Sequence, residues 1–440
     1  MASTKDWMDN FKLRLSAGIS GNDRVSTYAA LAQLGLNYYA SGGNEIMGMA
    51  PTSSANPKLK WETTYQYNAG LDLNLFDYRL NFTADVYYKD TRDMLYLATL
   101  SAQSGYTTQW QNLGRVENKG IELSLSTHNI DKRNFKWSSN ITFDLSRNKV
   151  VDIGGIEYTS LKIAGGAIGN DISRIIVGQP IGVGYGYVAD GNYQIDDFIV
   201  RMKDKNGKPI GPELPSEIVT SATYDNFTYE LREGVTSINS VTVRPGDRKY
   251  KDLPDKNGKY DGEITVDDRT VISNSNPDFT MGFGNNFTLW DFEISCFLEG
   301  VYGRDIMNEF KVRTEGGDQQ AFNNLSKAAW YGRWTPENKS NTYSQILNQT
   351  YDYVSSYYVE DGSYLRIKTL SLAYNLPEKW CNAIKFNSLK VSFNVDNVWV
   401  FTKYSGIDPD VSSSSSLFPG LDRMSYPKPR TFTFGISASF

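Results

Sequence analysis

A period of two in the apolar residues recurs along this chain and limits its fold more than any other feature. In residues 80–89, polar Asn81, Thr83, Asp85 and Lys89 alternate with an apolar or aromatic set, Leu80, Phe82, Ala84, Val86 and Tyr88. The same pattern returns in residues 137–146, 292–299 and 389–396. Successive side chains of a β-strand point to opposite faces, so each segment predicts a strand with one apolar and one polar face. Many runs are long enough to match the roughly 9–11 residues of a tilted membrane strand.

The connections between these segments alternate between short and long. Short or moderate connections lie at 76–78, 130–135, 178–182, 289–292 and 376–388, and long ones at 21–59, 96–113, 152–171, 191–278, 302–363 and 403–428. This order predicts an all-β fold of about twelve antiparallel strands, with every short turn at one end and every long loop at the other. Such sorting is typical of a transmembrane outer-membrane β-barrel, with short periplasmic turns and long extracellular loops. A β-sandwich or a propeller has no reason to sort its loops in this way.

Two of the twelve strands fit the pattern less simply. The strand at 173–177 is short and is included because the alternation of connections requires it. In the strand at 364–374, Arg366 and Lys368 fall on the same parity as Leu370 and Leu372.

Composition narrows the class of protein further. The net charge is −5, which argues against nucleic acid as a partner because phosphate binding needs a basic surface. Mean hydropathy is −0.45, and no apolar stretch approaches the roughly 18 residues of a membrane-spanning helix. A membrane role is therefore expected only through strands, whose alternation keeps hydropathy low.

Several segments spread along nearly the whole chain carry distinctive motifs, among them "NLGRVENKGIELSLSTHNI", "VGQPIGVGYGYVADGNYQ", "PGDRKYKDL", "DGSYLRIKTLSLAYNLP" and "YPKPRTFTFGISASF". In sequence and in order, these segments closely resemble the SusC/RagA-like family of TonB-dependent outer-membrane transporters of the Bacteroidetes. The resemblance implies that residues 1–440 form the C-terminal part of a family barrel of about 22 strands. Residues 194–277 would be a large extracellular loop insertion, and the plug domain and N-terminal barrel strands would be absent.

The resemblance also implies a function and a set of partners. The expected function is energised import of glycans, oligosaccharides or peptides across the cell outer membrane of a Bacteroidetes-like Gram-negative bacterium. The expected partners are outer-membrane lipid and a SusD-like surface lipoprotein that closes over the barrel. TonB would act only through the missing plug region. The alternative is a structural or adhesive outer-membrane β-protein without energised transport.

One long segment carries a candidate calcium site. In "PDKNGKYDGEITVDD", oxygen ligands at Asp255, Asn257, Asp261 and Asp268 surround two glycines, in an order similar to an EF-hand loop. Two extra residues separate Asn257 from Asp261, so a solvated turn rich in Asp, Asn and Gly is the alternative reading. No other cofactor is predicted.

Aromatic residues of the long connections are candidates for substrate contact. Rings beside amides and carboxylates suit sugars, but the same rings could instead pack loops against one another or against the lid. The candidates are Trp330, Trp334, Tyr351, Tyr353, Tyr357 and Tyr358. Catalysis is not expected: the single histidine, His128, lies beside a short turn, which excludes most Ser–His arrangements and any His-rich metal site.

Overall fold

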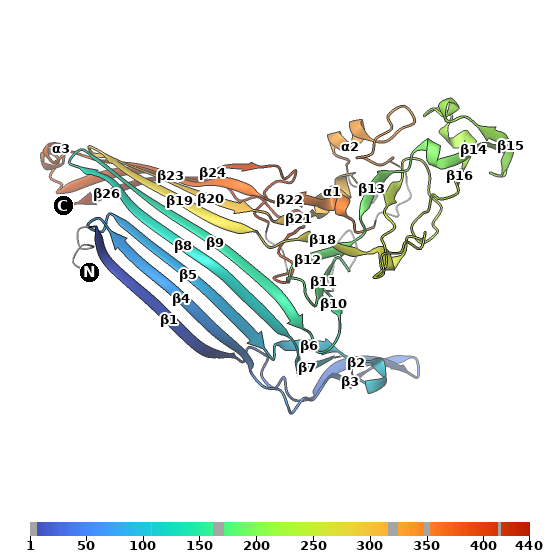
Figure 1. Cartoon of the computed structure of the whole chain (residues 1–440), viewed down its shortest axis with the longest axis horizontal. Coiled ribbons are helices and arrows are strands. Elements are labelled where there is room, and N and C mark those ends of the chain that lie inside the picture. Colours follow the sequence, from blue (N-terminus) through green and yellow to red (C-terminus); the bar gives the residue numbers. More distant parts are fainter. Residues whose placement is uncertain (1–6, 107, 162–170, 316–323, 347–352, 412–414) are drawn as a thin grey trace.

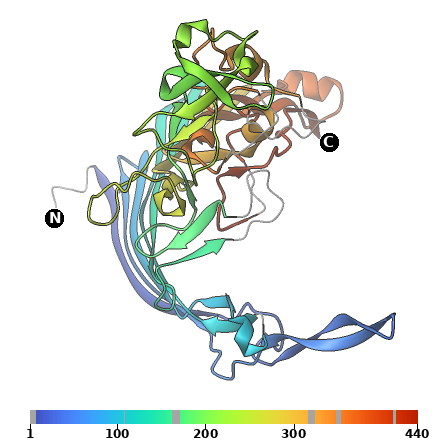
Figure 2. The same cartoon turned by 90° about the vertical axis from the view of Figure 1, so that its right-hand side faces the viewer.

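The computed structural model describes residues 7–106, 108–161, 171–315, 324–346, 353–411 and 415–440. Ten antiparallel strands form one curved sheet, called the wall here, in which neighbours follow chain order (Figures 1 and 2). The wall strands are β1 (Met8–Asn22), β4 (Glu62–Leu75), β5 (Leu80–Arg92), β8 (Arg115–Lys132), β9 (Phe135–Asp152), β19 (Phe279–Leu289), β20 (Phe292–Tyr302), β23 (Tyr364–Asn375), β24 (Ser388–Thr402) and β26 (Thr431–Ser439).

The connections of the wall are sorted as the sequence predicts. The short turns lie at one end, together with the start of β1, the end of β26 and the small helix α3 (Glu378–Ala383) between β23 and β24 (Figure 1). The long connections lie at the other end and fold into smaller sheets. The antiparallel, sorted architecture inferred from the sequence is therefore confirmed.

The smaller sheets and two short helices form an outer layer beyond the wall. Its elements are β2 (Gln33–Ser41), β3 (Asn44–Ser54), β6 (Leu95–Thr99), β7 (Thr108–Asn112), β10 (Tyr158–Leu161), β11 (Ser173–Ile176), β12 (Val183–Gly186), β13 (Ala189–Asn192), β14 (Phe198–Lys203), β15 (Pro209–Leu214), β16 (Phe227–Leu231), β17 (Arg248–Tyr250), β18 (Thr270–Asn274), β21 (Asp305–Asn308), α1 (Glu309–Glu315), α2 (Lys327–Gly332), β22 (Val359–Asp361) and β25 (Leu421–Asp422). Fully buried Met307, Phe418 and Leu421 form part of its core.

The prediction of about twelve wall strands is wrong in number, because two of the predicted strands belong to this outer layer. β11 and β12 pair with β10 and β18 in a separate four-stranded sheet. Each has only four residues, which span about 13 Å and cannot cross a membrane. Ser173 of β11 and Val183 of β12 are both buried. The two strands therefore lack the exposed apolar side of a wall strand.

The two faces of the wall differ sharply in chemistry. On the apolar face, cross-strand register aligns Leu71, Ala84, Leu123 and Phe143 in one row, and large side chains such as Phe434 stay 79% exposed. On the polar face, Arg14 of β1 bridges Asp72 of β4 at 2.9 Å and Asp85 of β5 at 2.8 Å. Alternation of side chains along each strand produces both faces.

The apolar face ends at a definite row on the side of the outer layer. Register aligns Tyr67, Tyr88, Lys119 and Arg147 across β4, β5, β8 and β9. The row directly on the short-turn side is Ala69, Val86, Ile121 and Leu145. Aromatic rings followed by cations are the composition expected where hydrocarbon meets headgroups.

A β-bulge explains the irregular alternation in residues 364–374. In the pairing of β20 with β23, Phe297 faces Thr369 and Leu298 faces Ile367, which leaves Lys368 as the extra residue. A bulge reverses the parity of the residues beyond it. Arg366 therefore lies on the polar face, where it forms an ion pair with Asp408, whereas Leu370 and Leu372 lie on the apolar face.

No helix within the described residues is long and apolar enough to cross a lipid bilayer.

Candidate functional site

A cavity of about 370 Å³ lies on the polar face, between the wall and the outer layer. Its wall side is made by the outer ends of four strands, and its roof by three connections that fold back over them. The wall-side residues are Glu62, Thr91, Val116, Asn118 and Asn148, and the remaining lining residues are Met94, Ile181, Asn276, Ser416, Leu417 and Pro419. We call it the polar-face cavity.

Strand register positions the wall side of this cavity. Thr91 of β5 faces Val116 of β8, and Asn118 of β8 faces Asn148 of β9. Thr91 also shares a hydrogen bond of 2.9 Å with Thr64 of β4, whose hydroxyl is the next group along the row. The side chains converge because all lie near the outer ends of neighbouring strands on the same face.

Asparagine side chains fix the roof to the wall. The Asn148 side chain accepts a hydrogen bond from the Ile181 N–H at 2.6 Å and donates to Asn276 Oδ1 at 3.1 Å. Asn276 in turn donates to the Ile181 carbonyl at 2.6 Å. These amides hold three segments that lie far apart in the sequence, so the roof has a defined position over the strands.

The lining offers neutral hydrogen-bonding groups beside apolar ones. The Asn118 carboxamide makes no hydrogen bond within the described part of the chain, so both its donors and its acceptor are available. Glu62 is the one charged residue among the described lining residues, and Met94, Val116 and Leu417 supply apolar surface. Such a mixture suits a neutral polar group with an apolar side.

A second cavity, of about 390 Å³, lies entirely within the outer layer. It is lined by residues 235–243 together with parts of β16 and residues 262–265. It does not border the wall, so the polar-face cavity is the better candidate for a molecule that passes along the polar face.

The predicted aromatic contacts are mostly packing residues in this structure. Trp334 is 2% exposed and Tyr358 fully buried, and Tyr353 packs 5.6 Å from Tyr187. Trp330 is 49% exposed, and Tyr351 lies outside the described residues. Trp330 is therefore the candidate with an accessible ring, and substrate contact by these residues stays a prediction.

Tyr357 has a distinct electrostatic setting in the outer layer. The Arg248 guanidinium lies 3.5 Å from its ring centroid and the Lys311 amine 4.3 Å, and its hydroxyl donates to Glu315 at 2.9 Å. Burial raises the pKa of the Tyr357 hydroxyl and also that of the Glu315 carboxyl. Tyr357 therefore contacts two cations through its ring and a carboxylate through its hydroxyl, all within the outer layer.

The residues of the predicted calcium loop hold turns of the backbone. Asp255 accepts hydrogen bonds from the N–H groups of Lys259 and Asn257, which hold its pKa below the usual range. Asp268 is 4% exposed and accepts from Leu253 and Thr265.

Asp261 accepts from the N–H of Glu263, in a turn of its own. Among the described residues, no group of three or more His, Cys, Asp or Glu side chains is placed to hold a metal ion. Calcium binding stays a prediction. A calorimetric titration of the protein with calcium would test this prediction, and an absence of binding heat would contradict it.

The polar-face cavity was missed from the sequence, although part of its signal is present there. Asn118, Thr91 and Asn148 stand on the polar parity at the outer ends of their strands, and position alone could have selected them. The roof residues Ile181 and Asn276 have no comparable signal in the sequence, because only the fold brings their connections over the wall.

Comparison with known proteins decides the family. The family described as TonB dependent receptor-like, beta-barrel matches residues 6–398. The chain belongs to the TonB-dependent receptor β-barrel family. TonB-dependent receptor P3 of Formosa agariphila is 33% identical over 437 residues, covering 98% of this chain and 39% of that protein. TonB-dependent receptor SusC of Bacteroides thetaiotaomicron is 25% identical over 446 residues, covering 98% of this chain and 38% of SusC.

Solved structures agree in fold with this TonB-dependent receptor barrel. The RagAB peptide importer in its open-open state superposes with a TM-score of 0.74 at 22% identity, covering 99% of this chain and 40% of that one. The resemblance to the SusC/RagA-like family and the outer-membrane location are thereby confirmed. The apolar face of the wall accordingly meets lipid. The chain spans about two-fifths of the length of the relatives it matches.

Proposed function

We propose that this TonB-dependent receptor chain forms the C-terminal part of the barrel of an importer for glycans or oligosaccharides, with peptides as the other substrate class. The polar-face cavity carries the proposal. The Asn118 amide, which makes no hydrogen bond in the described part of the chain, matches sugar hydroxyls, as do the Thr91 hydroxyl and the Glu62 carboxylate. Met94 and Leu417 match the C–H side of a sugar ring. A site that hydrogen-bonds hydroxyls discriminates strongly against ligands lacking them.

The role of this chain in import is passive. The wall separates lipid from the polar passage, and the outer layer shapes the entrance above it. Energy would come from TonB acting on a plug domain of the whole transporter.

Replacing Asn118 with tryptophan is the direct test of the cavity. The larger side chain extends into the 370 Å³ cavity and displaces the bound sugar, so we expect uptake of the transported oligosaccharide to fall about tenfold. Uptake of labelled oligosaccharides and peptides by cells producing the whole transporter is the measurement. Ile121→Trp, on the apolar face of the same strand, is the matched control and should leave uptake unchanged. Equal uptake by the parent and the Asn118 variant would refute a role for the cavity.

We also propose that the hairpin β2–β3 contacts a SusD-like surface lipoprotein. The hairpin extends away from the rest of the molecule (Figure 2), and one of its faces is apolar and open. Its residues, all between 57% and 70% exposed, are Leu34, Leu36, Tyr38, Met47 and Met49. Register places Leu36 opposite Met49 and Tyr38 opposite Met47, so the five form one continuous surface. An exposed apolar face of this kind marks an interaction site.

Introducing charge on this face should break the contact. For Leu36→Glu combined with Met49→Glu, we expect the lipoprotein to bind about a hundredfold more weakly, since two central apolar contacts are lost. Copurification of the lipoprotein with the tagged transporter is the measurement. Asn37→Glu with Ser41→Glu, on the other face of β2, adds the same charge and should retain binding. Retention by both double variants would argue against this surface.

A further inference from the structure

The outer boundary of the apolar face carries a basic patch, and two lysines of this patch form no ion pair with an acidic residue among the described residues. The patch consists of Arg92, Arg115, Lys119, Arg147 and Lys149, on the outer ends of β5, β8 and β9. Its acidic neighbours are held by the arginines: Asp90 by Arg92 and Arg115 at 2.7 Å each, Glu117 by Arg115 at 2.8 Å, and Asp278 by Arg147 at 2.9 Å.

Lys119 and Lys149 differ from the arginines of the patch, which hold the neighbouring carboxylates. Both are exposed, and neither has a carboxylate within ion-pair distance in the described part of the chain. They lie on adjacent strands in neighbouring rows, since Lys119 faces Arg147 and Lys149 faces Glu117. Two ammonium groups that form no ion pair in the described part of the chain therefore lie on adjacent strands, where hydrocarbon gives way to headgroups.

An apolar hollow begins directly beside Lys119. It has a volume of about 690 Å³ and is lined on the apolar face by Leu15, Ala17, Tyr67, Ala69, Val86 and Tyr88, with Lys119 at its rim. Register explains the hollow, because small Ala17 faces Tyr67 and small Ala69 faces Leu15 and Val86. The Tyr67 and Tyr88 rings stack with centroids 6.5 Å apart and border it.

We infer that this surface binds one outer-leaflet lipid whose headgroup carries phosphate. The phosphate would lie against Lys119 and Lys149, and an acyl chain would occupy the hollow between Leu15, Ala69 and Val86. Charge complementarity selects an anionic headgroup, and the position at the end of the apolar face selects a lipid over a soluble anion. Basic residues at a membrane surface bind anionic lipid additively.

The test uses the whole purified transporter in detergent and a phosphorylated lipid A-type glycolipid, with its dephosphorylated form as the matched probe. Native mass spectrometry measures lipid retained per protein across a concentration series. We expect Lys119→Gln with Lys149→Gln to weaken binding of the phosphorylated lipid about 30-fold, roughly fivefold for each lysine. Lys205→Gln with Lys208→Gln, exposed in the β14–β15 turn, removes the same charge and should leave binding unchanged.

Three results would overturn the inference. They are equal binding by the Lys119/Lys149 variant and the parent, equal binding of the dephosphorylated lipid by the parent, and displacement of the lipid by millimolar inorganic phosphate alone. Ala69→Phe keeps both lysines and places a ring in the hollow where the acyl chain would lie, so it should also weaken retention. If the Ala69→Phe variant retained the lipid as well as the parent does, the acyl chain would not occupy the hollow.

Discussion

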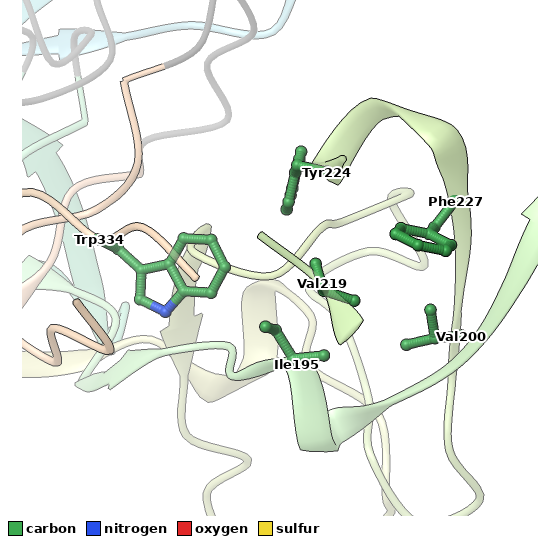
Figure 3. Packing of buried hydrophobic residues seen from close by; sticks show 6 residues of the cluster. All are labelled: Ile195, Val200, Val219, Tyr224, Phe227 and Trp334. Carbon is green, nitrogen blue, oxygen red and sulfur yellow. The ribbon is translucent and has the colours of Figure 1, made fainter. Parts of the chain in front are cut away.

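Replacing Trp334 with alanine is expected to unfold the outer layer around residues 194–250 while the wall stays folded. The indole is 2% exposed and packs at a centroid distance of 6.0 Å against Tyr224 (Figure 3). Its Nε1 donates a hydrogen bond to Gln194 Oε1 at 3.0 Å. Gly246 lies against it so closely that a Cβ there would be 2.4 Å from the ring. Truncating a buried tryptophan costs about 3–5 kcal/mol, which is enough to open a small satellite core.

Hydrogen exchange of the whole protein would measure this effect. Amides of β14 and β16 should lose protection, whereas amides of β8 and β9 should keep it. Trp330→Ala is the matched control. Trp330 lies four residues earlier in the chain, and its ring is 49% exposed, so its removal should not open a core. Unchanged protection of β14 and β16 in the Trp334 variant would show that other contacts of the cluster, such as Ile195 with Val200 and Phe227, suffice.

The wall could be read from the sequence because its order is local. A period of two along each strand, and a turn or a loop between strands, are both visible in one dimension. β5 and β24 were predicted with their faces correct for this reason. The pattern gave the wrong sheet for β11, because that segment is too short to distinguish a wall strand from a strand of the outer layer. It also left the faces of β23 unexplained, because the bulge at Lys368 changes the parity within the strand.

The candidate site was less predictable because its parts come together only in three dimensions. Asn148, Ile181 and Asn276 meet through hydrogen bonds that span up to 128 residues of sequence. The aromatic candidates show that one residue type can take two structural roles. Tryptophan and tyrosine rings bury large areas in cores as readily as they bind sugars, so residue type could not separate exposed Trp330 from buried Trp334.

Replacing Leu123 with arginine is expected to destabilise the barrel in lipid by about 2–4 kcal/mol, because the side chain points to hydrocarbon near the middle of the membrane. The apolar face runs along β8 from Thr127 to Lys119, and Leu123 lies halfway between them. Denaturant unfolding of the whole protein in lipid vesicles is the measurement.

Two controls on the same strand separate the effect of the strand face from the effect of depth in the membrane. Ser124→Arg adds the same charge one residue away on the polar face, where water reaches it, and should cost less than about 1 kcal/mol. Thr127→Arg lies on the apolar face at the short-turn boundary, where the cost should also fall to about 0–1 kcal/mol. Equal destabilisation by Leu123→Arg and Ser124→Arg would mean that lipid does not distinguish the two faces of the wall. The boundary row at Tyr88 and Lys119, and with it the lipid site beside Lys119, depends on that distinction.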